Sequence, residues 1–460
     1  MSHSSAVSSR LMHDVSEFNS AMLDRVLDYS RRRSLSTDVP LDATVSEEEL
    51  DRRVGHTVTE EGLGAERALG LFEDVLAPAC LTTNHPRYLA FIPAAPTKAA
   101  TAFDLVVSAS AVYGGSWLEG SGAVYAENQV IAWLAGEFGL PESAGGVFVQ
   151  GGTIGNLSAL VAARDHARAT RGNPSRGRWV VVCSAESHSS VASAARVMDV
   201  DVVAVRPGES GALTGQAVRA ALDEHGDAVF AVVATAGSTN FGIVDDIASI
   251  AALKADYDFW LHVDGAYGLA GMLSPLVRSH YAGVECADSL IVDPHKWLFA
   301  PFDACALIYR DPEVGRRAHT QHAEYLDALT ETPQWNPSDY AIHLTRRARG
   351  LPLWFSLATY GVAPYREAIT ACIELAHRIA DEIASRDGFH LVRHPELSVV
   401  VFEREGWTLV DYERWSTRLL DEQRAFVTPS SHAGRPNMRF AILNPLTTFD
   451  DLAGILDSME

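Results

Sequence analysis

The chain has 460 residues, which is too long for one ordinary hydrophobic core and predicts two or three domains. Its net charge is −22 and 47% of its residues are hydrophobic, so we expect a globular protein that binds neither a nucleic-acid backbone nor an anionic membrane. The five cysteines are scattered without a Cys-x-x-Cys pair, which predicts neither a disulfide framework nor a metal site. With no start that resembles a signal peptide and no apolar run of membrane length, the expected location is the cytoplasm.

The first 84 residues predict an N-terminal helical arm. Apolar residues recur at helical spacing between positions 15 and 27, and polar residues fill the opposite face. Three arginines, Arg31 to Arg33, follow this stripe, as suits the C-terminal end of a helix. The acidic run after Ser46 predicts the start of a second helix.

Short, valine-rich runs dominate residues 85–350. They are apolar almost throughout, which is typical of strands that are buried on both faces. Helical patterns lie between them, for example at Leu157–Arg171 and Thr214–His225. Strands that alternate with helices predict an α/β domain with a mostly parallel, seven-stranded sheet flanked by helices. The predicted strands are Gly146–Val149, Trp179–Cys183, Val202–Val205, Ala228–Thr235, Trp260–Asp264, Ser289–Val292 and Ala304–Tyr309.

Residues 351–460 predict a smaller C-terminal α+β domain. A helix-rich connection at Pro352–Gly361 leads to a long helical pattern from Tyr365 to Ser385. The candidate strands of this domain are Phe389–Val392, Ser398–Phe402, Phe426–Thr428 and Met438–Leu443.

Polar residues follow several of the predicted strands of the large sheet. In a parallel α/β sheet, ligands bind at the carboxyl ends of the strands, so one cleft could hold all of these side chains. Each residue alone also has an ordinary explanation: a turn aspartate, a satisfied structural histidine, a strand-end threonine or a solvated lysine. The residues concerned are Thr153, His188, Thr235, Asp264 and Lys296.

Lys296 lies in the motif Asp293-Pro294-His295-Lys296-Trp297, directly after the apolar run Leu290–Val292. Burial disfavours a charged amine, so we expect the pKa of Lys296 to be lowered. A neutral amine is a nucleophile toward aldehydes. Upstream, Trp260–Asp264 ends in a carboxylate, and the turn Gly151–Asn156 leads into a helical pattern whose N-terminus suits an anion.

This Asp-Pro-His-Lys-Trp motif, together with Asp264, Ser187-His188-Ser189-Ser190 and the glycine-rich turn, resembles the group II pyridoxal-phosphate-dependent amino-acid decarboxylases. That family includes the aromatic-L-amino-acid and glutamate decarboxylases and has the fold type I architecture of pyridoxal-phosphate-dependent transferases. The resemblance extends from about residue 85 to the C-terminus. It implies pyridoxal 5'-phosphate as the cofactor, and a homodimer whose active site lies near the interface and whose N-terminal arm packs across the partner.

The resemblance implies four roles around the cofactor ring. Lys296 would bond to the cofactor aldehyde. Asp264 would keep the pyridine nitrogen protonated, so that the ring can accept electrons. Ala266 would pack beneath the ring, and His188 would stack on its other face.

The resemblance also implies residues for the phosphate and the ring hydroxyl. Gly152 and Thr153 would hold the phosphate at the start of a helix. His295 would reach both the phosphate and the substrate, and Thr235 would lie near the ring hydroxyl. The chain departs from the family at Thr153-Ile154-Gly155, where serine–glutamate–alanine is more usual.

Besides His295, four residues are candidates for substrate binding. Phe91 and Ile92 lie in a segment that resembles the pocket-lining segment of the family, and Trp117 adds a further apolar side chain. Arg439 resembles the C-terminal arginine that can face the substrate carboxylate, although a surface arginine is the alternative. The apolar residues favour an aromatic or other hydrophobic substrate, because no basic residue is evident there to hold an acidic one.

Tyr340 precedes Arg346-Arg347-Ala348-Arg349 and resembles the family tyrosine that returns a proton to the α-carbon. The polar stretch from Thr330 to Ser338 suits a lid loop. Tyr325 is a rival for this role, and a packed structural tyrosine is the alternative for Tyr340. Family members with phenylalanine at the loop position tend to be aldehyde synthases, so Tyr340 favours simple decarboxylation.

We therefore expect a pyridoxal-phosphate-dependent decarboxylase that converts an L-amino acid to its amine and carbon dioxide. One rival is the same scaffold with other chemistry, such as oxidative deamination to an aldehyde, or lyase chemistry. A second rival is a non-catalytic homologue, against which intact Lys296, Asp264 and His188 argue.

Overall fold

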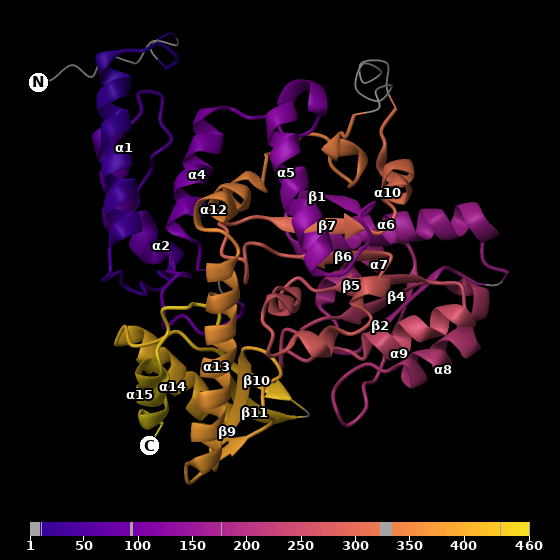
Figure 1. Cartoon of the computed structure of the whole chain (residues 1–460). Helices are drawn as coiled ribbons and strands as arrows, with labels where there is room; N and C mark the ends of the chain where they lie inside the picture. Colours follow the sequence, from indigo (N-terminus) through magenta and orange to yellow (C-terminus); the bar gives the residue numbers. More distant parts are fainter. Residues whose placement is uncertain are drawn as a thin grey trace, which may run out of the picture.

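The computed structural model describes residues 10, 12–92, 95–175, 177–322, 334–432 and 434–459. A large sheet with helices on both faces forms one side of the molecule, and a smaller sheet lies in the C-terminal part (Figure 1). The N-terminal helices lie on the far side of α4 from the large sheet (Figure 1).

Seven strands form the large sheet in the order β1-β7-β6-β5-β4-β2-β3. The pairs β2–β3, β2–β4, β4–β5 and β5–β6 are parallel, whereas β7 is antiparallel to both of its neighbours. The mostly parallel, seven-stranded sheet is thus confirmed, and each predicted strand overlaps an observed one. The strands are β1 (Gly145–Val149), β2 (Val180–Ser184), β3 (Asp201–Val205), β4 (Val229–Thr235), β5 (Trp260–Asp264), β6 (Ser289–Val292) and β7 (Cys305–Tyr309).

The large sheet is buried on both faces, which explains its nearly continuous apolar runs. On β4, Val232 faces one hydrophobic cluster and Val233 faces the other. Leu290 and Ile291 divide in the same way on β6. The edge strand β3 is the exception, because part of it reaches solvent.

Helices of the middle region cover the large sheet, and two further groups of helices belong to the N-terminal and C-terminal parts of the chain. The helices of the middle region are α4 (Lys98–Ala109), α5 (Trp117–Glu137), α6 (Gly152–Arg171), α7 (Ser189–Met198), α8 (Gly215–His225), α9 (Ile247–Ala252), α10 (Pro312–His319) and α12 (Leu351–Tyr360). The N-terminal helices are α1 (Glu17–Leu35), α2 (Glu47–Val54) and α3 (Ala65–Leu71), and the C-terminal ones are α13 (Ala363–Ser385), α14 (Leu409–Asp421) and α15 (Phe449–Asp457). Ser16 and Ser46 cap α1 and α2 by accepting a backbone N–H bond, and the helix start predicted after Ser46 is confirmed. Among the described residues, no helix is long and apolar enough to cross a membrane.

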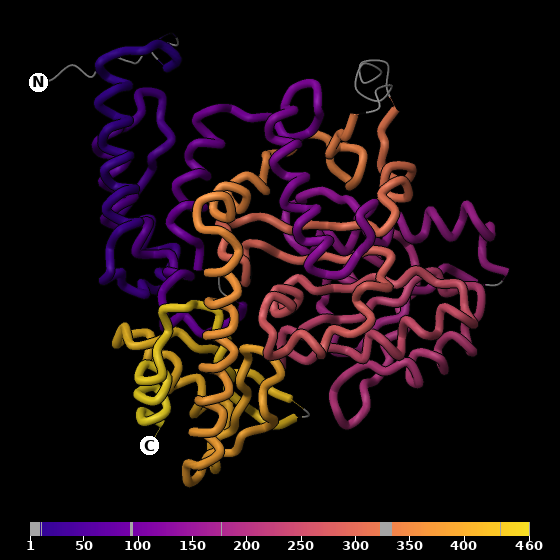
Figure 2. Tube along the Cα trace, viewed as in Figure 1, coloured from indigo at the N-terminus to yellow at the C-terminus, as the bar shows by residue number. Residues whose placement is uncertain are grey.

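The smaller sheet is antiparallel throughout, in the order β10-β11-β9-β8, and α13 packs against it. In Figure 2 its strands lie together in the orange and yellow part of the trace. The strands are β8 (Phe389–Leu391), β9 (Val399–Arg404), β10 (Pro429–His432) and β11 (Arg435–Ala441).

The strand predicted at Phe426–Thr428 is wrong. Phe426 accepts a backbone bond from Leu89 and donates one to Arg87, so it pairs with a distant loop instead of joining the ladder. The ladder begins afterwards, at Pro429. Of the apolar residues that suggested a strand, Val427 has no exposed surface and Phe426 is half-buried.

Candidate active site

A cavity of about 280 Å³ lies where the carboxyl ends of several strands of the large sheet meet. The loops that follow β1, β2, β4, β5 and β6 all contribute to its wall. The structure therefore brings together the residues that were predicted from the strand ends. Its described lining includes Gln150, Gly151, Gly152, Thr153, Asn156, His188, Ser190, Thr235, Thr239, Asp264, Ala266, Asp293, His295, Lys296 and Asp303.

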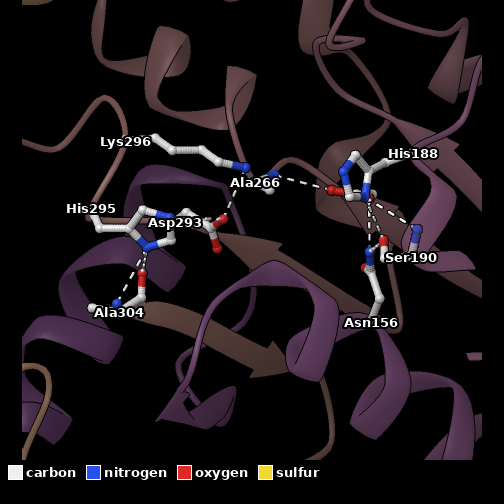
Figure 3. A network of polar contacts seen from close by, with 9 residues as sticks. Asn156, His188, Ser190, Ala266, Asp293, His295, Lys296 and Ala304 are labelled. Atoms are coloured by element: carbon white, nitrogen blue, oxygen red, sulfur yellow. Dashed lines mark hydrogen bonds and ion pairs between the residues drawn. The ribbon is translucent and has the colours of Figure 1, made fainter. Parts of the chain in front are cut away.

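Lys296 lies in this cavity and pairs with Asp293. Its Nζ is 3.0 Å from Oδ2 of Asp293, and Nε2 of His295 is 3.7 Å from the same oxygen (Figure 3). Burial lowers the pKa of Lys296, but the negative charges of Asp293 and Asp264 outweigh it, so the pKa is raised. The expectation of a lowered pKa is therefore wrong for this structure, because it considered burial without the carboxylate three residues earlier.

Asp264 ends β5 and is buried, with its two oxygens held separately. Oδ2 accepts a hydrogen bond of 2.8 Å from Nδ2 of Asn156, and Oδ1 accepts one of 3.2 Å from the backbone N–H of Ala266. Nδ2 of Asn156 also donates to Oγ of Ser190, at 2.8 Å (Figure 3). The carboxylate is thus fixed in direction before any ligand binds.

Asn156 is in turn fixed by a buried chain of polar groups that the sequence reasoning missed. Its Oδ1 is 2.8 Å from Nε2 of His262, whose Nδ1 is 2.8 Å from Oγ of Ser289. Because the amide nitrogen of Asn156 donates to Asp264, its oxygen must accept from His262, which assigns the proton of His262 to Nε2. Trp260 Nε1 donates to Ser289 Oγ at 2.8 Å and completes the chain. Burial lowers the pKa of His262 to about 4, so the ring is neutral.

His188 precedes α7 and caps that helix with its side chain. Its Nδ1 accepts a bond of 3.2 Å from the backbone N–H of Ser190 and lies 2.9 Å from Oγ of Ser190. The imidazole is therefore held at Nδ1 while much of the residue stays exposed at the cavity (Figure 3). This placement leaves ring surface available for a flat ligand.

Thr235 ends β4 and is held by a second buried acid, Asp245. The Thr235 backbone N–H donates to Oδ2 of Asp245 at 2.7 Å, and the N–H of Leu213 donates to Oδ1 at the same distance. Burial raises the pKa of Asp245 to about 7, against these two bonds. Oγ1 of Thr235 lies 3.4 Å from Oγ of Ser187, at the cavity wall.

The start of α6 forms the anion-binding end of the cavity. Gly151 has φ of 98°, a conformation that favours glycine, and α6 begins at Gly152. The first N–H groups of a helix have no acceptor within it, and they carry the positive end of its dipole. A Cβ at Gly152 would lie 3.2 Å from both Cβ of Ala266 and Oδ2 of Asp293, so a side chain there would be crowded.

These groups fit pyridoxal phosphate. The cavity offers an amine for the aldehyde, a fixed carboxylate for the ring nitrogen, an exposed imidazole for the ring face and a helix N-terminus for the phosphate. Oε1 of Gln150 is buried in its wall without a hydrogen-bond partner among the described residues. Unsatisfied polar atoms of this kind are typical of a site that a polar ligand completes.

Apart from His295, the residues predicted to bind the substrate do not lie in the cavity wall as the cofactor residues do. Phe91, Ile92 and Trp117 are not among the described residues that line the cavity. Buried Arg439 binds backbone carbonyls instead: it donates to Phe91 at 3.0 Å and also to Thr239, which does line the cavity. Arg439 thus ties the Phe91 segment to the cavity wall.

Tyr340 is likewise not among the described residues that line the cavity. It is 3% exposed, and its ring stacks on that of Trp335 with centroids 3.9 Å apart. Burial raises the pKa of its hydroxyl. Tyr325 and residues 330–333 of the predicted lid lie outside the described residues.

Comparisons with known proteins point in the same direction as the cavity. The family model described as "Pyridoxal-dependent decarboxylase conserved domain" matches residues 48–405. The aromatic-L-amino-acid decarboxylase of Bacillus atrophaeus is 29% identical over 91% of this chain and 89% of its own length. The L-2,4-diaminobutyrate decarboxylase of Rhizobium meliloti (strain 1021) is 30% identical over 87% of this chain and 82% of its own length. The 4-hydroxyphenylacetaldehyde synthase of Rhodiola rosea is 28% identical over 74% of this chain and 72% of its own length.

The fold has solved counterparts. The crystal structure of Oryza sativa TDC with PLP and tryptamine superposes with a TM-score of 0.87 at 26% identity, and covers 97% of each chain.

Proposed function

Because the chain belongs to the group II pyridoxal-dependent decarboxylases, we propose that it converts an aromatic or other hydrophobic L-amino acid to the corresponding amine and carbon dioxide. The chain is a pyridoxal-phosphate-dependent carboxy-lyase that acts on an amino acid. The preference for an aromatic substrate and the residue roles below are proposals.

The cofactor, when bound, supplies a ring that withdraws electrons from the bond to the departing carboxylate. Lys296 would hold the cofactor through its amine. Asp264 would keep the ring nitrogen protonated, and Asn156 fixes the direction of that carboxylate. His188 would cover one face of the ring, and the N–H groups at Gly152 and Thr153 would hold the phosphate.

The observation that carries the aromatic preference is the tie between the Phe91 segment and the cavity. Phe91 is 56% exposed and in ring contact with Phe426, whose ring also contacts Tyr88. Arg439 connects this aromatic group to Thr239 in the cavity wall. Although Phe91 does not line the cavity, an aromatic side chain that extended past Thr239 would meet its exposed ring. The similarity to the aromatic-L-amino-acid decarboxylase of Bacillus atrophaeus, at 29% identity, supports an aromatic substrate. The similarity to tryptophan decarboxylase 1 of Oryza sativa subsp. japonica, at 30% identity, supports the same class.

A cationic amino acid is the second candidate. Asp303 lines the cavity and its side chain is 46% exposed, although it also pairs with Arg349 at 2.8 Å. A carboxylate at the mouth of the cavity would attract an ammonium group on the substrate side chain. The similarity to the diaminobutyrate decarboxylase of Rhizobium meliloti supports this class.

Product analysis separates these candidates and tests the reaction itself. The purified enzyme, loaded with pyridoxal phosphate, is incubated with each common amino acid and with 2,4-diaminobutyrate. We expect carbon dioxide and the amine in equal amounts from tryptophan, tyrosine or phenylalanine. Release from diaminobutyrate alone would favour the second candidate. Aldehyde, ammonia and peroxide would favour the oxidative chemistry that the Rhodiola rosea relative suggests.

We also propose that the enzyme is a homodimer that the N-terminal helix α1 helps to hold. No residue of α1 is buried, and Phe18, Met22, Leu23 and Val26 are each at least 37% exposed. Contiguous exposed apolar surface of this kind marks an interaction site. Light scattering coupled to gel filtration should give twice the chain mass, and Met22→Glu with Val26→Glu should weaken the dimer.

A reducing compartment such as the cytoplasm suits the five cysteines, because none of them is paired and Cys80 and Cys286 are exposed.

A further inference from the structure

Asp293 places a buried negative charge at the end of the cavity that suits a phosphate. Its side chain is 2% exposed, and its Oδ2 lies 3.2 Å from the position that a Cβ on Gly152 would take. Gly152 is the first residue of α6, whose free N–H groups form the anion-binding end. A carboxylate and a bound phosphate would therefore share the same few ångströms of wall.

The charges around Asp293 offer little compensation for a second anion. Among the described residues that line the cavity, Lys296 is the only lysine or arginine, and it already pairs with Asp293 at 3.0 Å. Two other described titratable groups face Asp293, His295 on the same loop and the buried thiol of Cys305 on β7, and Asp264 at the end of β5 adds a second negative charge near Lys296. Oδ1 of Asp293 has no hydrogen-bond partner among the described residues.

We propose that Asp293 restrains cofactor loading, because its carboxylate opposes the cofactor phosphate at the N-terminus of α6. The proposal rests on the cofactor site proposed at Lys296. Asparagine has nearly the same shape and can donate a hydrogen bond to a phosphate oxygen, so Asp293→Asn removes a repulsion and adds a donor.

The expected effect is larger for the phosphorylated cofactor than for its unphosphorylated form. Asp293 also pairs with Lys296, so its removal alters the reactivity of that amine toward any aldehyde. This second effect applies equally to pyridoxal phosphate and to pyridoxal, which lacks the phosphate. The ratio of the two dissociation constants therefore isolates the interaction with the phosphate, in the manner of a double-mutant cycle.

The experiment titrates cofactor-free enzyme with pyridoxal phosphate and with pyridoxal, and follows the change in absorbance. The proteins are the wild type, Asp293→Asn and, as a charge-matched control, Asp303→Asn. Asp303 lines the same cavity, but its carboxylate is held by Arg349. We expect Asp293→Asn to lower the dissociation constant of pyridoxal phosphate about tenfold or more relative to that of pyridoxal, a change of the size that one charge contact gives. Asp303→Asn should change the ratio by less than about twofold, as exposed ion pairs do.

A second measurement needs no aldehyde. Inorganic phosphate should raise the unfolding temperature of cofactor-free Asp293→Asn more than that of the wild type. A ratio of dissociation constants that is unchanged in Asp293→Asn, or that shifts toward pyridoxal, would overturn the proposal. Borohydride reduction of the loaded wild type separates the test of the cofactor site from the test of Asp293. A cofactor label at Lys296 supports the cofactor site whatever the effect of Asp293. A label on another residue would remove the basis of both proposals.

Discussion

At the scale of single residues, the site depends on one amide, that of Asn156, which connects strand β5 with helix α7. Asn156 holds Asp264 and Ser190 with its nitrogen and His262 with its oxygen. Every one of these groups is buried, so each needs the bond that Asn156 makes. Asn156 therefore sets the direction of the carboxylate that faces the cofactor ring.

We predict that Asn156→Ala weakens both the cofactor site and the fold. The buried carboxylate of Asp264 and Nε2 of His262 each lose a partner, which costs about 1–3 kcal/mol per group. The free energy of unfolding, measured by urea denaturation of cofactor-free protein, should fall by that order, and the affinity for pyridoxal phosphate should fall about tenfold. Thr170→Ala, an exposed change on the same helix, should stay within about 0.5 kcal/mol of the wild type. Equal stability of Asn156→Ala and Thr170→Ala would show that the amide is not needed.

The cavity residues that belong to sequence motifs were predicted from the sequence. The residues that form hydrogen bonds between those motifs were not predicted. Lys296, Asp264 and His188 follow strands, and parallel topology predicts that such ends meet. Asn156 contacts Asp264 across 108 positions of sequence, and no local pattern marks that contact. The one available signal was a histidine, His262, inside an otherwise apolar strand.

At the scale of elements, α6 approaches the sheet closely because its first turns are small. A Cβ on Gly155 would lie 2.9 Å from both Sγ of Cys305 and Cγ2 of Ile291, on two neighbouring strands. Since Gly155 begins a buried run of α6, an added methyl group must push the helix away from the strands. The start of α6, where the phosphate site is proposed, would move with it.

We predict opposite outcomes for two glycine-to-alanine changes in helices. Gly155→Ala should destabilise the protein by about 1–3 kcal/mol through overpacking, and should also weaken binding of pyridoxal phosphate. Gly136→Ala in α5 meets nothing within 4 Å, so it should stabilise the protein by about 0.5–1 kcal/mol through better helix propensity. Denaturant midpoints of the two variants and the wild type check this order. A Gly155→Ala protein as stable as Gly136→Ala would contradict the proposed close packing.

The elements themselves were largely predictable, because continuous apolar runs and helical stripes have distinct periods. The C-terminal part shows where prediction from local sequence patterns fails. Phe426–Thr428 has the residues of a strand, but its backbone partners lie more than 300 positions earlier in the chain. A pairing so distant in sequence leaves no local trace.

At the scale of the whole molecule, buried histidines should make the fold sensitive to acid. Burial lowers the pKa of His85, His262 and His343 to about 4, whereas the unfolded chain titrates near 6.5. Between those values the unfolded state binds more protons, so stability is lost as the pH falls. Asp245 has the opposite effect on stability, because its pKa is raised to about 7 and the folded state binds its proton more tightly. Its contribution offsets the loss of stability from about one of the three histidines.

We therefore predict that the free energy of unfolding of cofactor-free protein falls by about 2–4 kcal/mol from about pH 7 to about pH 5. His262→Gln should have a shallower slope, because it removes one of the groups that the unfolded state protonates. Urea denaturation at several pH values gives both slopes. A stability that is constant or rises toward pH 5 would mean that these histidines are not held neutral in the folded state.

The measurement that tests the central claim most directly is the location of the cofactor bond. The lysines of the chain are Lys98, Lys254 and Lys296, so peptide mapping distinguishes them without ambiguity. The enzyme loaded with pyridoxal phosphate is reduced with borohydride, digested and analysed by mass spectrometry. We predict the reduced cofactor on the peptide that contains Lys296, and unmodified Lys98 and Lys254. A label on either of the other two lysines, or no label at all, would contradict the account.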